Sequence, residues 1–84
     1  MEGIDMQSIK GGNVIGKNIR RVRKSRKLTQ DVLAAKLQVK GLDISRGTLA
    51  KIESGIRHIT LEELKTIKEV LKMEYSDFFD EPET

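Results

Sequence analysis

Cationic side chains recur four residues apart over residues 17–27, in a segment of helical periodicity. Like charges at this spacing lie on one face of a helix and repel each other, each pair costing roughly 0.2–0.5 kcal/mol. A polyanion such as nucleic-acid phosphate would offset the repulsion without any reading of sequence. The helix dipole accounts for cations at the C-terminal end, Arg26 and Lys27, but not for those further upstream. The three pairs are Lys17 with Arg21, Arg20 with Lys24, and Arg23 with Lys27.

A second group of residues, after Gly41, could contact the edges of bases. At 100° per residue, Leu49 and Ile52 fall on one side of a helix. Gly47 costs up to about 1 kcal/mol relative to alanine in a helix, so either another surface approaches closely or a neighbour inside the protein crowds it. Small outward residues with an arginine at the N-terminal end suit a DNA major groove. The stripe on the side of this helix opposite Leu49 and Ile52 consists of Gly47, Ala50, Lys51 and Ser54.

Three helix starts are marked by a hydroxyl residue that follows an apolar one, with leucine four residues further on. The hydroxyl caps an N–H of the first turn, and the two apolar side chains close over the entry. The hydroxyl residues are Thr29, Ser45 and Thr60, and Glu63 completes a capping box with Thr60. These signals place the basic segment (residues 17–27) and the stripe of small outward residues that begins at Gly47 on separate helices.

The periodicity predicts five helical elements and no strand. Gly41 is expected to end the second helix in the left-handed conformation, and a four-residue connection containing glycine is typical of a helix-turn-helix. The fourth helix is expected to bury Leu61, Leu64, Ile67, Val70 and Leu71, and the last turn to bring together Tyr75, Phe78 and Phe79. The predicted helices cover residues 13–26, 29–40, 45–54 and 61–72, with a short turn after Ser76.

Length and composition exclude several classes of protein. The chain has 84 residues, no cysteine and a single histidine, so it predicts one small domain with no disulfide, no metal site and no cofactor. It shows no nucleophile–base pair and no phosphate-cradling loop, which argues against an enzyme. No apolar run approaches the span of a bilayer and no secretion signal is visible, so we expect a soluble cytoplasmic protein without membrane contact.

Charged residues are distributed unevenly along the chain. Residues 1–58 contain 13 Lys and Arg against 5 Asp and Glu, whereas residues 59–84 contain 3 against 8. This division favours one face for a polyanion and another that avoids it, although chance clustering on a solvated surface would look similar. We expect residues 1–12 to form a flexible arm, residues 13–79 the domain, and residues 80–84 an acidic tail.

The order of these residues resembles a known family. The runs IGKNIRRVRKSRKLTQDVLAAKL and ISRGTLAKIESGIRHITLEELKTIKEVLKMEYSDFF are similar to the phage-repressor and Cro-like (XRE) helix-turn-helix domains, over roughly residues 14–79. The resemblance implies an all-α, compact five-helix lambda-repressor-like domain whose second and third helices form the helix-turn-helix. The segment QVKGLDI is longer than the usual connection, so the second helix is expected to be extended by about one turn, which leaves the half-site geometry open.

The resemblance also implies roles for individual residues. Gln30 would hold a phosphate and brace the third helix, which contacts the bases. Glu53 would pair with Arg23 in a structural salt bridge. Ala50 stands where many relatives are polar, and it would touch a thymine methyl or leave space. Arg46 is the candidate for bidentate recognition of guanine. The full set of expected DNA-binding residues is Lys17, Arg20, Lys24, Gln30, Ser45, Arg46, Gly47, Thr48, Ala50, Lys51 and Arg57.

The sequence therefore predicts sequence-specific binding of double-stranded DNA by a transcriptional regulator, most simply a repressor that acts by occupying its operator. Such domains usually bind paired half-sites, so we expect a homodimer at least on DNA. The alternative is an antitoxin or other regulatory module that binds a protein partner and for which DNA is secondary. Loss of binding to the strongest partner at 200 mM salt would favour DNA, because phosphate contacts are strongly salt-dependent.

Overall fold

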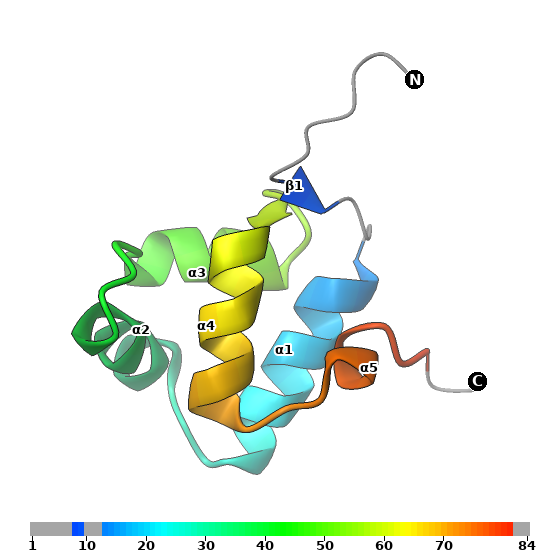
Figure 1. Ribbon diagram of the computed structural model, residues 1–84, viewed down its shortest axis with the longest axis horizontal. Coiled ribbons are helices and arrows are strands. Elements are labelled where there is room, and N and C mark those ends of the chain that lie inside the picture. Colours follow the sequence, from blue (N-terminus) through cyan, green and yellow to red (C-terminus); the bar gives the residue numbers. More distant parts are fainter. Residues whose placement is uncertain (1–7, 10–12, 82–84) are drawn as a thin grey trace.

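The computed structural model describes residues 8–9 and 13–81, which form five helices and one pair of very short strands (Figure 1). The helix-turn-helix consists of α2 and α3, as expected, and α1 and α4 pack against it. The elements are β1 (Ser8–Ile9), α1 (Val14–Ser25), α2 (Gln30–Val39), α3 (Arg46–Glu53), β2 (Ile59–Thr60), α4 (Leu61–Leu71) and α5 (Tyr75–Phe78).

The three capping signals begin α2, α3 and α4. The side chains of Thr29, Ser45 and Thr60 each accept a hydrogen bond at 3.1 Å from the backbone N–H three residues later. At α4 the Glu63 carboxylate also accepts the Thr60 N–H at 2.9 Å, which completes the capping box. The predicted helix starts are confirmed.

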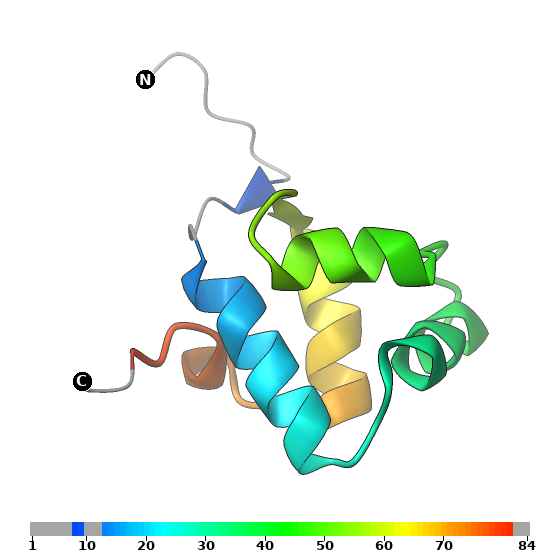
Figure 2. The same cartoon turned by 180° about the vertical axis from the view of Figure 1, so that it is seen from behind.

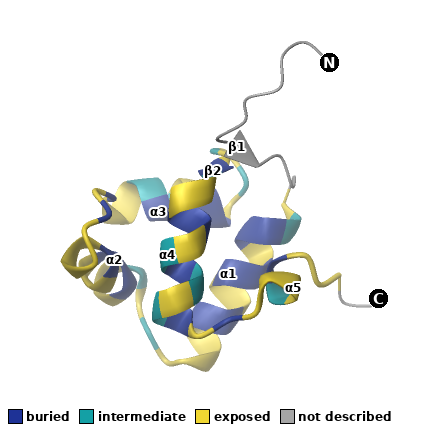
Figure 3. Cartoon of the chain, in the orientation of Figure 1, coloured by how far each residue is buried: buried dark blue, intermediate teal, exposed yellow. Residues whose placement is uncertain are grey.

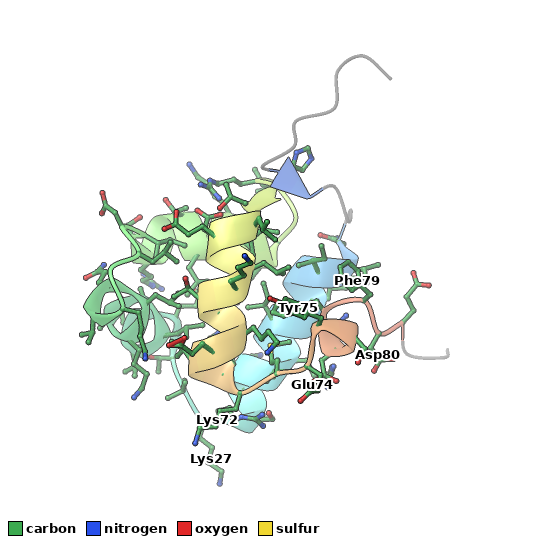
Figure 4. The ribbon with its side chains drawn as sticks, in the orientation of Figure 1. Lys27, Lys72, Glu74, Tyr75, Phe79 and Asp80 are labelled. Atoms are coloured by element: carbon green, nitrogen blue, oxygen red, sulfur yellow. The ribbon has the colours of Figure 1, made fainter. Side chains whose placement is uncertain are left out.

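Left-handed residues end several of the helices. Gly41 (φ 92°) and Gly55 (φ 82°) follow α2 and α3, as predicted. Two lysines adopt the same conformation: Lys27 (φ 60°) follows α1, and Lys72 (φ 57°) follows α4. A side chain in this conformation costs about 1–2 kcal/mol. Both lysines lie at the lower end of the molecule in Figure 4.

The apolar core lies where the inner faces of all five helices meet (Figure 3). Phe78 is completely buried and closes the α5 end, whereas Phe79 and Tyr75 stay half exposed. The prediction that Leu61 is buried was wrong, because this first residue of α4 is 44% exposed. Val70 is only partly buried against the core. The remaining predicted core residues of α4, Leu64, Ile67 and Leu71, are buried.

A buried amide joins the two ends of the domain. Asn18 of α1 is 2% exposed and donates to the carbonyl oxygens of Phe78 at 2.9 Å and Asp80 at 2.7 Å. A buried polar group needs such partners, because leaving it unpaired costs about 1–3 kcal/mol.

The helical turn near residue 76 begins earlier than predicted, at Tyr75.

The prediction of no strand was wrong. Ser8 and Ile9 pair antiparallel with Thr60 and Ile59, respectively, so part of the expected flexible arm lies against the turn that precedes α4. A two-residue strand has no readable alternation of polar and apolar residues, which is why the sequence does not predict it. The rest of the expected arm (residues 1–7 and 10–12) and the last three residues of the expected tail lie outside the described residues.

Candidate nucleic-acid interface

The outer stripe of α3 is open to solvent. Leu49 and Ile52 are buried, while Gly47, Lys51 and Ser54 are exposed and Ala50 is half-buried. A Cβ atom built on Gly47 would meet only the Ser45 Oγ, at 3.8 Å. Crowding by the described residues therefore does not explain this glycine.

Beside this stripe, α1, α2 and α3 surround an open hollow of about 740 Å³. In Figure 2 these three helices lie in front and α4 lies behind them. Five of the predicted DNA-binding residues line the hollow, while Lys17, Ser45, Gly47, Thr48, Lys51 and Arg57 do not. The five are Arg20, Lys24, Gln30, Arg46 and Ala50.

Only some of the cations of α1 are available to an external anion. Arg21 lies 3.9 Å from the carboxylate of Asp80, and Arg26 donates to the carbonyl oxygens of Leu71 and Lys72 at the end of α4. Arg21 therefore has an acidic neighbour within the protein. Arg20 and Lys24 are exposed at the hollow.

A buried ion pair holds α3 against α1. Arg23 donates from Nε to Glu53 at 2.7 Å and from Nη2 at 3.0 Å, and both side chains are less than a tenth exposed. Arg23 also donates to the Leu28 carbonyl at 2.7 Å. Gln30 adds a hydrogen bond from Nε2 to Glu53 at 3.0 Å, which ties the start of α2 to the end of α3. The structure thus contains both the Arg23–Glu53 pair and the Gln30 brace that the resemblance implied.

Close backbone contact reinforces this arrangement at Gly16 in α1. A Cβ atom on Gly16 would lie 2.3 Å from the Ile52 carbonyl oxygen and 2.6 Å from that of Glu53. No real Cβ atom comes so close, so glycine is what allows α1 to touch the end of α3. The orientation of the exposed stripe is fixed by this contact together with the ion pair.

Sequence reasoning missed one charged residue of the hollow, Asp31. Its carboxylate lies 3.7 Å from Nε of Arg46, and both side chains are largely exposed. Asp31 is the second residue of α2, where an acidic residue is ordinary because of the helix dipole. Nothing in its spacing marks it, since the partner is fifteen positions away.

Arg57 is held by the protein itself. Its guanidinium donates to both carboxylate oxygens of Glu63 at 2.9 Å, and to the His58 carbonyl at 3.0 Å. Burial raises the pKa of Glu63, but hydrogen bonds from Arg57 and Thr60 outweigh burial and leave this pKa below its ordinary value. The same ion pair raises the pKa of Arg57. An arginine fixed in this way is less free to reach a phosphate than Arg20 or Lys24.

Comparison with protein families matches the helix-turn-helix family over residues 19–78, which is most of the chain. The chain belongs to this family, and to its XRE type. The match begins inside α1 and ends at the last residue of α5, so it includes all of α2 and α3 and the part of α1 that lines the hollow. As an XRE-type helix-turn-helix protein, the chain is a DNA-binding regulator of transcription.

A solved structure of known role is similar to this helix-turn-helix protein. The restriction-modification controller protein C.AhdI from Aeromonas hydrophila aligns with a TM-score of 0.68 at 26% sequence identity. The alignment covers 82% of this chain and 96% of C.AhdI. A search of curated proteins finds no match. Within residues 8–9 and 13–81, no helix is long and apolar enough to cross a bilayer.

Proposed function

We propose that this helix-turn-helix protein binds a specific duplex sequence and represses transcription by occupying it, with α3 inserted in the major groove. In this arrangement Arg46 and Ala50 meet base edges, while Arg20, Lys24 and Gln30 contact the phosphates beside the groove. Lys17 and Lys51 extend the phosphate contacts on either side, whereas Arg57 stays with Glu63 and serves the fold. Ser45 and Thr48 serve mainly the N-cap of α3, because the two side chains are hydrogen-bonded to each other at 3.1 Å.

The single observation that carries this proposal is the open space around Gly47. Glycine in a helix costs the fold up to about 1 kcal/mol relative to alanine, and no neighbour among residues 8–9 and 13–81 requires it. The residue lies on the exposed stripe of α3, next to a hollow lined by cations. A duplex that packs closely against the stripe supplies the missing reason.

The likeness to a controller protein supports regulation through DNA in preference to the alternative of a protein-binding antitoxin. The cations at the hollow support it further, because Arg20 and Lys24 are exposed on the same side as Arg46.

We propose a homodimer as the active form on DNA, with the two copies of α3 in successive major grooves about 34 Å apart.

Selection of binding sites from random duplex DNA, followed by two matched substitutions, tests the proposal. Arg46→Ala should weaken binding to the selected site by about 1–3 kcal/mol and change binding to random duplex much less, because a bidentate contact to guanine is lost. Lys24→Ala should weaken binding to both duplexes similarly and reduce the salt slope by about one, because a phosphate contact is lost.

Two results would contradict the proposal. One is a wild-type chain that enriches no sequence at low salt. The other is a loss for Arg46→Ala that is equal on selected and random duplex, which would make Arg46 another phosphate contact. Binding to a protein that survives 200 mM salt, with no DNA binding, would instead favour the antitoxin-like alternative.

A further inference from the structure

The hollow beside α3 is cationic on most sides, yet it contains an exposed carboxylate, that of Asp31. Its lining includes Arg20, Lys24 and Arg46, and the carboxylate of Asp31 lies 3.7 Å from the Arg46 Nε. An anion that faces a polyanion weakens binding through repulsion. Its presence in this hollow therefore calls for a benefit that outweighs the repulsion.

The geometry of the pair suggests what that benefit is. A guanidinium has five N–H donors in a fixed fork, and a guanine edge needs only two of them. Asp31 approaches Arg46 most closely at Nε, and among the described residues neither Nη group of Arg46 forms a hydrogen bond, which leaves both available to a base. The separation of 3.7 Å is an ionic contact, longer than a hydrogen bond, which leaves the arginine able to move when a better acceptor is present.

The helix dipole alone is a weaker explanation of Asp31. An acidic residue in the first turn of α2 does gain from the dipole, but the gain does not depend on which side of the helix the residue occupies. Thr29 already caps this turn by accepting the Val32 N–H. Asp31 instead lies on the side that faces the first residue of α3.

We propose that Asp31 is a positioning residue for DNA specificity: it holds Arg46 away from phosphates on unrelated DNA and orients it toward guanine at the correct site. This inference rests on the proposed function of Arg46. On random duplex, Arg46 stays with Asp31 and adds little affinity. On the selected site, Arg46 binds the guanine edge through its Nη groups while Nε remains beside the carboxylate.

The test measures affinity for the selected site and for random duplex at the same salt concentration. Asp31→Asn should strengthen binding to random duplex by about two- to fivefold, the range expected for an exposed ion pair. It should leave binding to the selected site unchanged or weaker, so the ratio of the two affinities falls. In an Arg46→Ala background, Asp31→Asn should leave that ratio unchanged.

Asp43→Asn is the matched control, because it changes the net charge equally at an exposed position of the turn between α2 and α3. It should not change the ratio. If Asp31→Asn strengthens both affinities equally, Asp31 only repels phosphate and the proposal is wrong. If Arg46→Ala lowers specificity while Asp31→Asn does not, only this inference fails. If no variant changes specificity because the wild type has none, the proposed function fails.

Discussion

Two glycines of the domain have opposite surroundings. A Cβ atom on Gly16 would lie 2.3 Å from a carbonyl oxygen of α3, whereas one on Gly47 would be 3.8 Å from its nearest neighbour. We expect Gly16→Ala to lower the free energy of unfolding by about 1–3 kcal/mol, because α1 and α3 must separate. Gly47→Ala should raise it by about 0.5–1 kcal/mol, because alanine favours the helix. Urea unfolding of both variants measures the difference.

The same pair of variants separates stability from function. If a duplex packs against α3, the more stable Gly47→Ala variant should bind the selected site less tightly than the wild type. A stabilised variant with unchanged affinity for DNA would show that nothing approaches Gly47 closely. Equal loss of stability at both positions would contradict the open surroundings of Gly47.

Individual contacts were predictable to very different degrees. The Arg23–Glu53 pair came from the resemblance, since the two residues are thirty positions apart. The hydrogen bonds of Asn18 to Phe78 and Asp80 cross 60 and 62 positions, and no local pattern signals them. The Asp31–Arg46 contact was missed for the same reason. A side chain's type is visible in the sequence, but the long-range partner that determines its role is not.

Helix starts were predictable because their cause is local. Each cap needs one hydroxyl and an N–H three residues later, so Thr29, Ser45 and Thr60 could be recognised without any tertiary contact. The β1–β2 pair could not, since its register depends on segments about fifty residues apart. Leu61 was misassigned because a residue in the first turn of a helix can fit the apolar spacing of that helix and still lie beyond the edge of the core.

At the level of the element, the start of α4 should depend on pH through Glu63. The folded pKa of this carboxyl is lowered, so its contribution to stability is present above the ordinary pKa of about 4.3 and is lost as the pH falls through the folded value. At pH 7, Glu63→Gln should lower the free energy of unfolding by about 1–2 kcal/mol, because it weakens both the capping box and the Arg57 pair. The difference from wild type should shrink below about pH 4.

Glu62→Gln is the control for this prediction, because Glu62 is the exposed neighbour in the same turn. Its difference from wild type at pH 7 should be small, because the Glu62 side chain is exposed. Chemical unfolding at a series of pH values gives both curves. A Glu63→Gln difference that grows as the pH falls would have the wrong sign and would contradict a lowered pKa.

Across the whole molecule, the structure distributes the charge differently from a simple division of the sequence. Several basic residues of the N-terminal part serve the fold, as Arg23, Arg26 and Arg57 do through carboxylates or helix carbonyls. The cations at the hollow are therefore fewer than the count of residues suggested, but they lie together beside α3. Position, more than net charge, distinguishes the face that we propose for DNA.

The homodimer that we propose would present two copies of α3 to one duplex. Phe78 is fully buried, but Phe79 is 50% and Tyr75 is 46% exposed at the α5 side of the molecule (Figure 4). If these rings form the dimer contact, Phe79→Ala should shift sedimentation toward monomer and weaken binding to a paired site far more than to a single half-site, with thermal stability at low concentration nearly unchanged. Val39→Ala, at an 86% exposed position of α2, should leave the assembly as it is. A wild type and a Phe79→Ala variant that are both monomeric, on and off DNA, would exclude this contact.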